Sequence, residues 1–286
     1  MSEASLRGVE VKLARAREHA RTLHEESRAF FEQDLYRFVV DVHNDGRKHV
    51  WRTDCDPPSL PDHFAALLGD FVHNLRSALD HLAWQLVLLN GGEPHELTQF
   101  PIRSAEFRYI DRVAQPAVVV RGGVSDIALS KIRAVQPYAT EGGTRDSGLW
   151  WLHKLNVIDK HRHLLVFAAG AFGLFGGWTF PTSIITPLKP LKRDEVVMVL
   201  TYASRQEVHK DMKPMLAVFL AKTGVVVPTD RRHMSSLMDG IYMAVETVID
   251  RFRPMFGIPT ISTDDAMDYH RRLWFPDWVS PNWLGP

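Results

Sequence analysis

Four stretches of the chain carry apolar residues at three- and four-residue spacing, which is the repeat of a helix with one buried face. They cover residues 5–34, 61–89, 148–162 and 233–253. The second stretch is the most regular: its apolar residues run from Phe64 to Leu89, and the pair Gly91-Gly92 ends it. The sequence therefore predicts four long helices, which can pack as a bundle.

Two other regions have the pattern of β-strands. Residues 36–53 alternate between apolar and polar on both sides of Asn44-Asp45-Gly46, a sequence typical of a hairpin turn. Residues 164–222, between the third and fourth helices, hold further short apolar stretches. We therefore predict an α+β fold in a single domain over residues 1–286: a helical bundle with an inserted antiparallel sheet and an N-terminal hairpin.

Composition narrows the class of protein. The 286 residues include 34 Lys and Arg against 34 Asp and Glu, so no net charge draws the whole surface to nucleic acid or membrane. The single cysteine excludes a disulfide framework. The uncharged stretch 164–188 is interrupted by glycine and proline, so we interpret it as two buried strands around a turn and not as a membrane helix. We expect a cytoplasmic protein with no membrane contact.

Polar residues interrupt the apolar pattern of two of the helices. On the second helix, one row at three- to four-residue spacing contains Asp70, His73, Asn74, Ser77 and His81, and Arg76 and Asp80 flank this row. On the third, one face contains His153, Asn156 and Lys160, with Asp159 beside it. If these helices pack antiparallel, the two clusters meet and form a polar seam, because polar groups beside an apolar bundle need partners.

The segment from Arg76 to His81 resembles the R-x4-6-H motif of the HEPN-family ribonucleases, which are helical-bundle proteins often found among toxins and defence components. The resemblance implies that His81 acts as acid and base on a ribose 2′-hydroxyl, and that Arg76 holds the scissile phosphate. It also implies RNA as the substrate, a homodimer in which two such helices meet, and no metal or cofactor.

Two alternatives remain open from the residues alone. In the first, the seam is a buried hydrogen-bonded network in a non-enzymatic binding or assembly protein, with Arg76 paired to Asp80 or to an acid on another helix. In the second, the protein is a metal-dependent hydrolase, although the spacing matches no specific metal motif. Its nitrogen ligands would be His73, His81, His153 and His161.

Two further features of the sequence do not indicate a chemical activity. The stretches GDFVHNLRSALDHLAWQL and LWWLHKLNVIDKHRHLLV resemble an uncharacterised group of bacterial, actinobacterial proteins to which we attach no activity. The C-terminal tail concentrates Trp274, Phe275, Trp278 and Trp283. Such a tail either packs on its own chain or anchors a partner protein, since tryptophan is common at interfaces.

Overall fold

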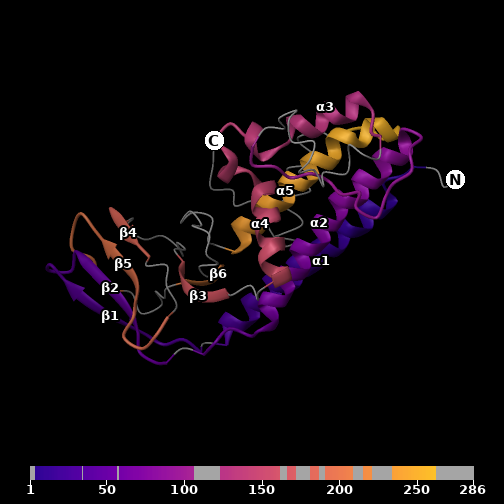
Figure 1. Ribbon diagram of the computed structural model, residues 1–286. Helices are drawn as coiled ribbons and strands as arrows, with labels where there is room; N and C mark the ends of the chain where they lie inside the picture. The colour runs from indigo at the N-terminus through magenta and orange to yellow at the C-terminus, as the bar shows by residue number, and fades with distance from the viewer. Residues whose placement is uncertain are drawn as a thin grey trace. The chain divides into compact units, whose positions relative to one another are not determined.

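The protein has an α+β fold, as the sequence predicts (Figure 1). A computed structural model describes residues 4–33, 35–56, 58–105, 123–161, 166–171, 181–186, 191–208, 215–220 and 234–261. Within these ranges the chain forms five α-helices and six β-strands. The Trp-rich tail lies outside them.

The four predicted long helices are present with closely similar bounds. They are α1 (Arg7–Glu32), α2 (His63–Leu89), α4 (Gly148–His161) and α5 (Met234–Phe252). The fifth, α3 (Asp126–Ala134), is shorter. It begins after Ser125, whose side-chain oxygen accepts a hydrogen bond from the Ala128 N–H at 3.2 Å.

The predicted hairpin is strand β1 (Phe38–His43) paired antiparallel with β2 (Lys48–Thr53). Asn44, Asp45 and Gly46 all have positive φ angles, which asparagine, aspartate and glycine tolerate best. Strands β5 (Val196–Thr201) and β4 (Ser183–Ile185) extend the hairpin into a four-stranded antiparallel sheet of order β1-β2-β5-β4. Trp51 and Met198, opposite each other on β2 and β5, are buried on one face of this sheet.

The two strands within the uncharged stretch belong to different sheets. Strand β3 (Val166–Ala171) pairs with β6 (Met215–Leu220), whereas β4 pairs with β5. The prediction that both strands are buried is wrong for β4, whose three residues are all exposed. Among the strands that the structure describes, β4 lies at the edge of its sheet and pairs with β5 alone, so its other side is left uncovered.

The described part of the chain contains no helix that is both long and apolar enough to cross a membrane.

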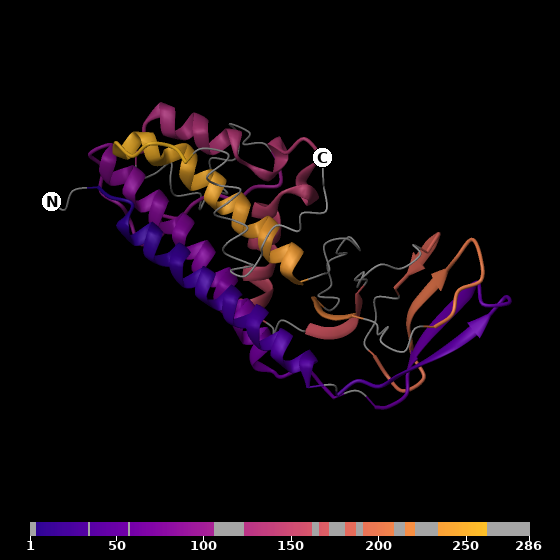
Figure 2. The same ribbon diagram turned by 180° about the vertical axis from the view of Figure 1, so that it is seen from behind.

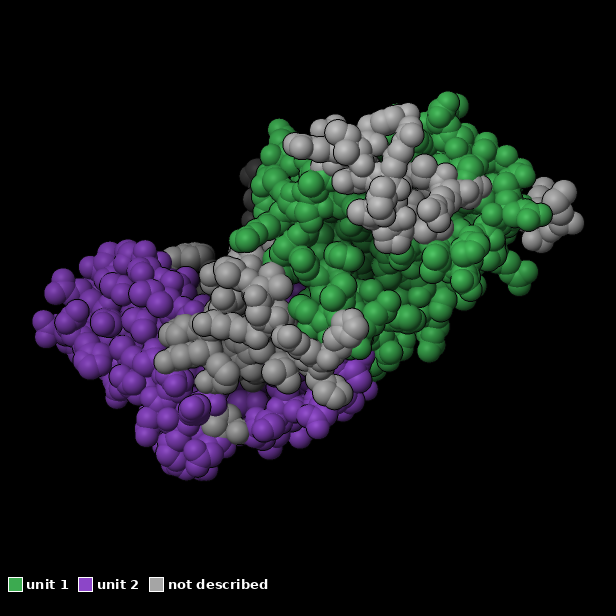
Figure 3. Space-filling view, in the orientation of Figure 1, with its two compact units in different colours: residues 1–24, 67–162, 238–286 green, residues 25–66, 163–237 purple. Residues whose placement is uncertain are grey.

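The chain divides into two compact units, each built from separate segments (Figure 3). Unit 1 comprises residues 1–24, 67–162 and 238–286, and unit 2 comprises residues 25–66 and 163–237. Because the chain passes from one unit to the other four times, no single linker separates them in the sequence. The pattern of residues along the chain therefore indicates one domain.

Helices account for the core of unit 1. In this unit α1 and α2 lie side by side and antiparallel (Figures 1 and 2): the Ser5 N–H donates to Gln85 Oε1 at 2.9 Å, and Gly8 lies against His81. At the start of α4, Gly148 approaches α5 so closely that a Cβ atom there would lie 2.3 Å from the carbonyl oxygen of Gly240. Glycine at this position therefore permits the two helices to cross in contact.

We expect Gly148→Ala to destabilise the protein by about 1–3 kcal/mol, because the added methyl group would overlap the α5 backbone. The matched control is Gly240→Ala, where an added Cβ has open space and alanine should raise stability by up to about 1 kcal/mol through its helix propensity. Thermal and denaturant unfolding of both variants measures these effects. Equal stability of the two variants would contradict this helix contact.

A second contact, between α1 and α5, is polar. Arg17 Nε donates to the Tyr242 hydroxyl at 2.5 Å, and Arg17 Nη2 lies 3.6 Å from a carboxylate oxygen of Glu246. Glu246 is buried, and burial raises the pKa of its carboxyl group although Arg17 and Arg253 act to lower it. Asp250 adds to the rise in pKa by like-charge repulsion.

The direction of this shift sets a pH dependence of stability. In the unfolded chain Glu246 ionises at about its ordinary pKa of 4.5, and in the folded chain only at higher pH. The free energy of unfolding should therefore fall as pH rises from 4.5 through the raised folded pKa. We expect Glu246→Gln to remove this part of the decline, as measured by denaturant unfolding across the pH range. Exposed Glu10→Gln is the control for loss of an acidic side chain, and parallel profiles for the wild type and Glu246→Gln would exclude Glu246 as the cause.

Candidate functional site

Helix α2 has a buried side, a solvent side and a polar flank between them. Its apolar residues, such as Leu68, Leu75 and Leu82, are buried in the core. The predicted polar row faces the solvent: Asp70, His73 and His81 are exposed, and Asn74 and Ser77 are partly buried. The row makes a local bond within α2, from Asn74 Nδ2 to the carbonyl oxygen of Asp70 at 2.8 Å.

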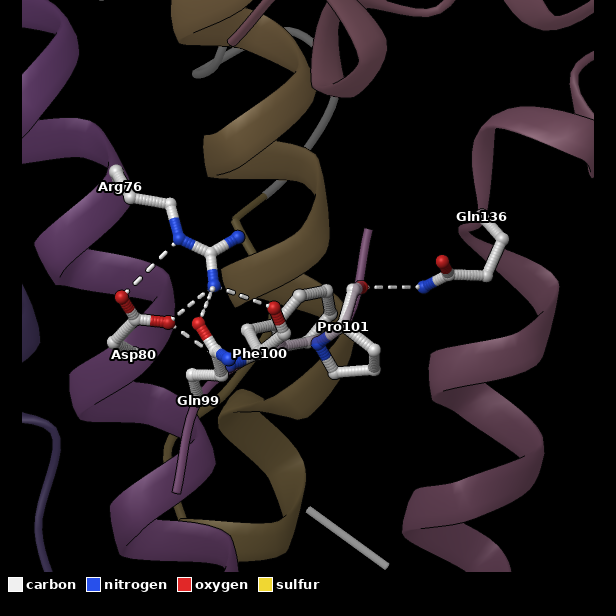
Figure 4. A network of polar contacts seen from close by, with 6 residues as sticks. All are labelled: Arg76, Asp80, Gln99, Phe100, Pro101 and Gln136. Atoms are coloured by element: carbon white, nitrogen blue, oxygen red, sulfur yellow. Dashed lines mark hydrogen bonds and ion pairs between the residues drawn. The ribbon is translucent and has the colours of Figure 1, made fainter. Parts of the chain in front are cut away.

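Arg76 is buried at the polar flank of α2 and is bound to Asp80 one turn further on (Figure 4). Its Nη2 and Nε atoms donate to the two carboxylate oxygens of Asp80, at 2.6 and 3.2 Å. This two-point geometry is the strongest that an arginine and a carboxylate form.

The same ion pair holds the chain segment that follows α2. Arg76 Nη2 also donates to the Phe100 carbonyl oxygen at 2.7 Å and to Gln99 Oε1 at 3.4 Å. In return the Phe100 N–H donates to Asp80 Oδ1 at 2.9 Å. The pair therefore satisfies both backbone polar groups of Phe100, whose side chain is fully buried.

Gln136 carries the network on to α3. This side chain is 1% exposed. Its Nε2 donates to the carbonyl oxygen of Pro101 at 3.0 Å (Figure 4). The same nitrogen donates to the Ile132 carbonyl oxygen at 3.0 Å, and Oε1 accepts from the Arg103 N–H at 2.9 Å. A continuous set of hydrogen bonds thus connects α2, residues 99–103 and the end of α3.

Helix α4 supplies the other side of the predicted seam. A Cβ atom on Gly69 would lie 2.5 Å from Asp159 Oδ1, so the carboxylate of Asp159 rests on the backbone of α2. Further along the two helices, His153 lies near enough to Arg76 for the guanidinium to influence its pKa. Gly69 of α2 thus lies near Asp159 of α4, and Arg76 lies near His153. Because the residue numbers rise along one helix as they fall along the other, the two helices pack antiparallel, as the predicted seam requires.

Burial governs the charges in this seam. It lowers the pKa of His153, and the positive charges of Arg76, Lys154 and Lys160 lower it further, which favours the neutral imidazole. Burial raises the pKa of the Asp80 carboxyl group, against the opposing effect of Arg76.

The structure does not place Arg76 and His81 together. Five helical residues are about 140° apart around the helix axis. Arg76 is 8% exposed and bound by its own chain, whereas His81 is exposed and lies beside Gly8 of α1. Within one chain the two groups do not face a common space that an RNA phosphate could enter.

The other predicted residues divide between the seam and the surface. Asn156 is buried and His153 and Asp159 are partly buried, whereas Lys160 is exposed. His161 is the last residue of α4, and its side chain lies outside the described part of the structure. Among the described residues, no three His, Cys, Asp or Glu side chains are grouped so as to hold a metal ion.

Sequence reasoning missed the partners of Arg76 outside its own helix. Gln99 and the backbone of Phe100 lie more than twenty positions away. Gln136, which binds the adjacent Pro101 and not Arg76 itself, lies further still. Residues 99–103 have no helical or strand periodicity, so nothing in the pattern indicated that they cross the polar flank of α2. Only the i, i+4 spacing of Arg76 and Asp80 was a usable signal.

Comparison of the chain with models of protein families, with curated proteins and with solved structures found no match in any of the three.

We expect Arg76→Ala to lower the free energy of unfolding by about 2–3 kcal/mol, because it leaves a partly buried carboxylate and a buried carbonyl without their donor. In a double-mutant cycle, Asp80→Ala and the double variant should show coupling of about 1 kcal/mol or more. Partly buried Ser77→Ala, next to Arg76, is the control and should change stability by less than about 0.5 kcal/mol. Additive effects in the cycle would exclude a structural ion pair.

Proposed function

We propose that this chain is a non-enzymatic binding or assembly protein, in which the polar seam between α2 and α4 is structural. The observation that carries this proposal is that Arg76 binds groups of its own chain through one edge of its guanidinium. Its guanidinium is buried, and the edge that carries Nε and Nη2 is already occupied by the carboxylate of Asp80.

That occupation bears directly on phosphate binding. Arginine recognises a phosphate best through two parallel N–H groups on one edge of the guanidinium. At Arg76 these groups hold Asp80, and Nη2 also holds the Phe100 carbonyl oxygen. A phosphate at the same edge would have to displace both acceptors and leave them unpaired in a buried site, at a cost of about 1–3 kcal/mol for each group.

A metal-independent endoribonuclease of the HEPN type, toxin-like or defence-like, is the second candidate function. One observation favours it: the imidazole of His81 is exposed and so is accessible to a substrate. This candidate needs a different group to stabilise the phosphate, or a second protomer that supplies one.

Cleavage assays on the full-length protein separate these candidates. We expect no cleavage of single-stranded RNA in the presence of EDTA, by the wild type or by His81→Ala. Exposed His43→Ala, on β1, is the matched control for loss of an exposed imidazole. The same assay with Zn²⁺ or Mn²⁺ in place of EDTA tests the metal-dependent alternative.

One result would overturn the proposal: RNA cleavage in EDTA that His81→Ala abolishes and His43→Ala retains. Because His81 is exposed, His81→Ala should keep the wild-type circular dichroism and Tm. Loss of activity could then not be attributed to unfolding.

A further inference from the structure

The four-stranded sheet of unit 2 has one edge that is protected against pairing and one that is not. At one edge, β4 has only three residues and follows Pro181, and short strands and proline both limit pairing with another chain. At the other edge, β1 has six residues, contains no proline or lysine, and pairs with β2 without a bulge (Figure 1). Among the described strands, none pairs with the outer edge of β1. This edge therefore has the features of a strand that accepts another strand.

The backbone contacts of β1 show which residues direct their polar groups to the outer edge. The Asp54 N–H donates to the Arg37 carbonyl oxygen at 2.8 Å, so Arg37 faces β2. Thr53, which lies opposite Phe38, instead exchanges hydrogen bonds with residues 194–195, immediately before β5. Because this direction alternates along an antiparallel strand, every second residue from Phe38 faces outward. The residues with outward N–H and C=O groups are Phe38, Val40 and Val42.

The residues between them form a short charged and apolar pattern on one face of β1. Arg37, Val39 and Asp41 are all exposed, and alternation along the strand places them on the same face. In the described part of the chain, no contact holds the guanidinium of Arg37. Asp41 uses only Oδ2, which accepts from Arg52 Nε at 2.9 Å. A cation, a valine and an anion with one available oxygen therefore follow one another at equal spacing along the edge.

This pattern is complementary to itself in one antiparallel register. If β1 of a second copy lies along the edge with Val39 on a two-fold axis, Arg37 comes opposite Asp41 of the second copy, and this pair occurs twice. In the same register Phe38 comes opposite Val40 of the second copy. The outward backbone groups of the two strands then meet, as an antiparallel ladder requires. The registers centred one residue away, on Phe38 or on Val40, place Val39 opposite a charged residue and lose both charge pairs.

We propose that the outer edge of β1 is the docking surface for β1 of a second copy of this chain, with Val39 on the two-fold axis. This inference rests on the proposed assembly function, for which it names a partner and a surface. The backbone of Phe38 exchanges hydrogen bonds with Val40 of the second copy, so the two sheets become one continuous sheet. The guanidinium of Arg37 donates to Oδ1 of Asp41 of the second copy. The surface contains no residue of α2, so it differs from the helix contact that the motif resemblance implies.

Disulfide trapping on the full-length chain tests this register. Opposed residues that exchange no backbone hydrogen bonds have Cα atoms about 4.5 Å apart, which a disulfide can span. Val39→Cys places the two thiols together at the axis, so oxidised glutathione should convert this variant to a covalent dimer on a non-reducing gel. The matched control is Val42→Cys, an exposed valine of the same strand. Its two copies would lie roughly 20 Å apart along the strands, so it should stay monomeric, as should the wild type with its buried Cys55.

Two additional variants test the contacts that hold the strands together. Val40→Pro removes an outward N–H and leaves the hydrogen bonds to β2 in place. Arg37→Glu places two acidic residues opposite each other and changes only an exposed side chain, so it should keep the wild-type Tm and circular dichroism. Added to Val39→Cys, each change should reduce covalent dimer to the level of Val42→Cys. Without oxidation, the mass of the wild type in sedimentation equilibrium should rise with concentration towards twice 32.6 kDa.

Three results would each overturn the inference: a folded Val39→Cys variant that forms no covalent dimer, equal trapping of Val39→Cys and Val42→Cys, or trapping that Arg37→Glu leaves unchanged. These outcomes are distinct from those of the cleavage assay. If Val39→Cys stays monomeric in a chain that cleaves no RNA, the docking surface is wrong and the structural assignment of Arg76 stands. If the chain cleaves RNA through His81, the assembly function is wrong whatever the trapping shows.

Discussion

The ion pair between Arg76 and Asp80 is the interaction on which the arrangement of unit 1 depends most. It is local in sequence, one turn of α2, but its hydrogen bonds reach the backbone of Phe100. From there Gln136 connects the segment to α3. The network positions a stretch that has no regular secondary structure of its own and whose backbone would otherwise be buried without partners.

This role gives a reason for a charge pair beside an apolar core, where removing charged groups from water costs free energy. Burial raises the pKa of Asp80 despite its arginine partner. In general, replacing a buried ion pair by well-packed apolar residues often leaves stability unchanged or improves it. What the pair adds is directional hydrogen bonding. A guanidinium donates hydrogen bonds, and a carboxylate accepts them, only in particular directions. His153, kept neutral by burial and by neighbouring cations, lies near the arginine without adding another charge.

The two polar sides of α2 lie in different surroundings. The flank with Arg76 and Asp80 is hydrogen-bonded to other segments of the chain, whereas the side with Asp70, His81 and Trp84 is open to solvent. The flank therefore contributes to the packing of unit 1. The open side makes a local bond within α2, from Asn74 Nδ2 to the carbonyl oxygen of Asp70.

The helices, the hairpin and the fold class could be predicted from the sequence, because they follow from local periodicity and from turn residues such as Asn44 and Gly46. The sequence also placed Arg76 and Asp80 one helical turn apart. Which polar residues are buried could not be predicted in this way, since burial depends on segments far away in the chain, such as residues 99–101. The tertiary structure likewise separated Arg76 from His81: neighbours in a motif face different directions on a helix, and packing decides which direction is the interior.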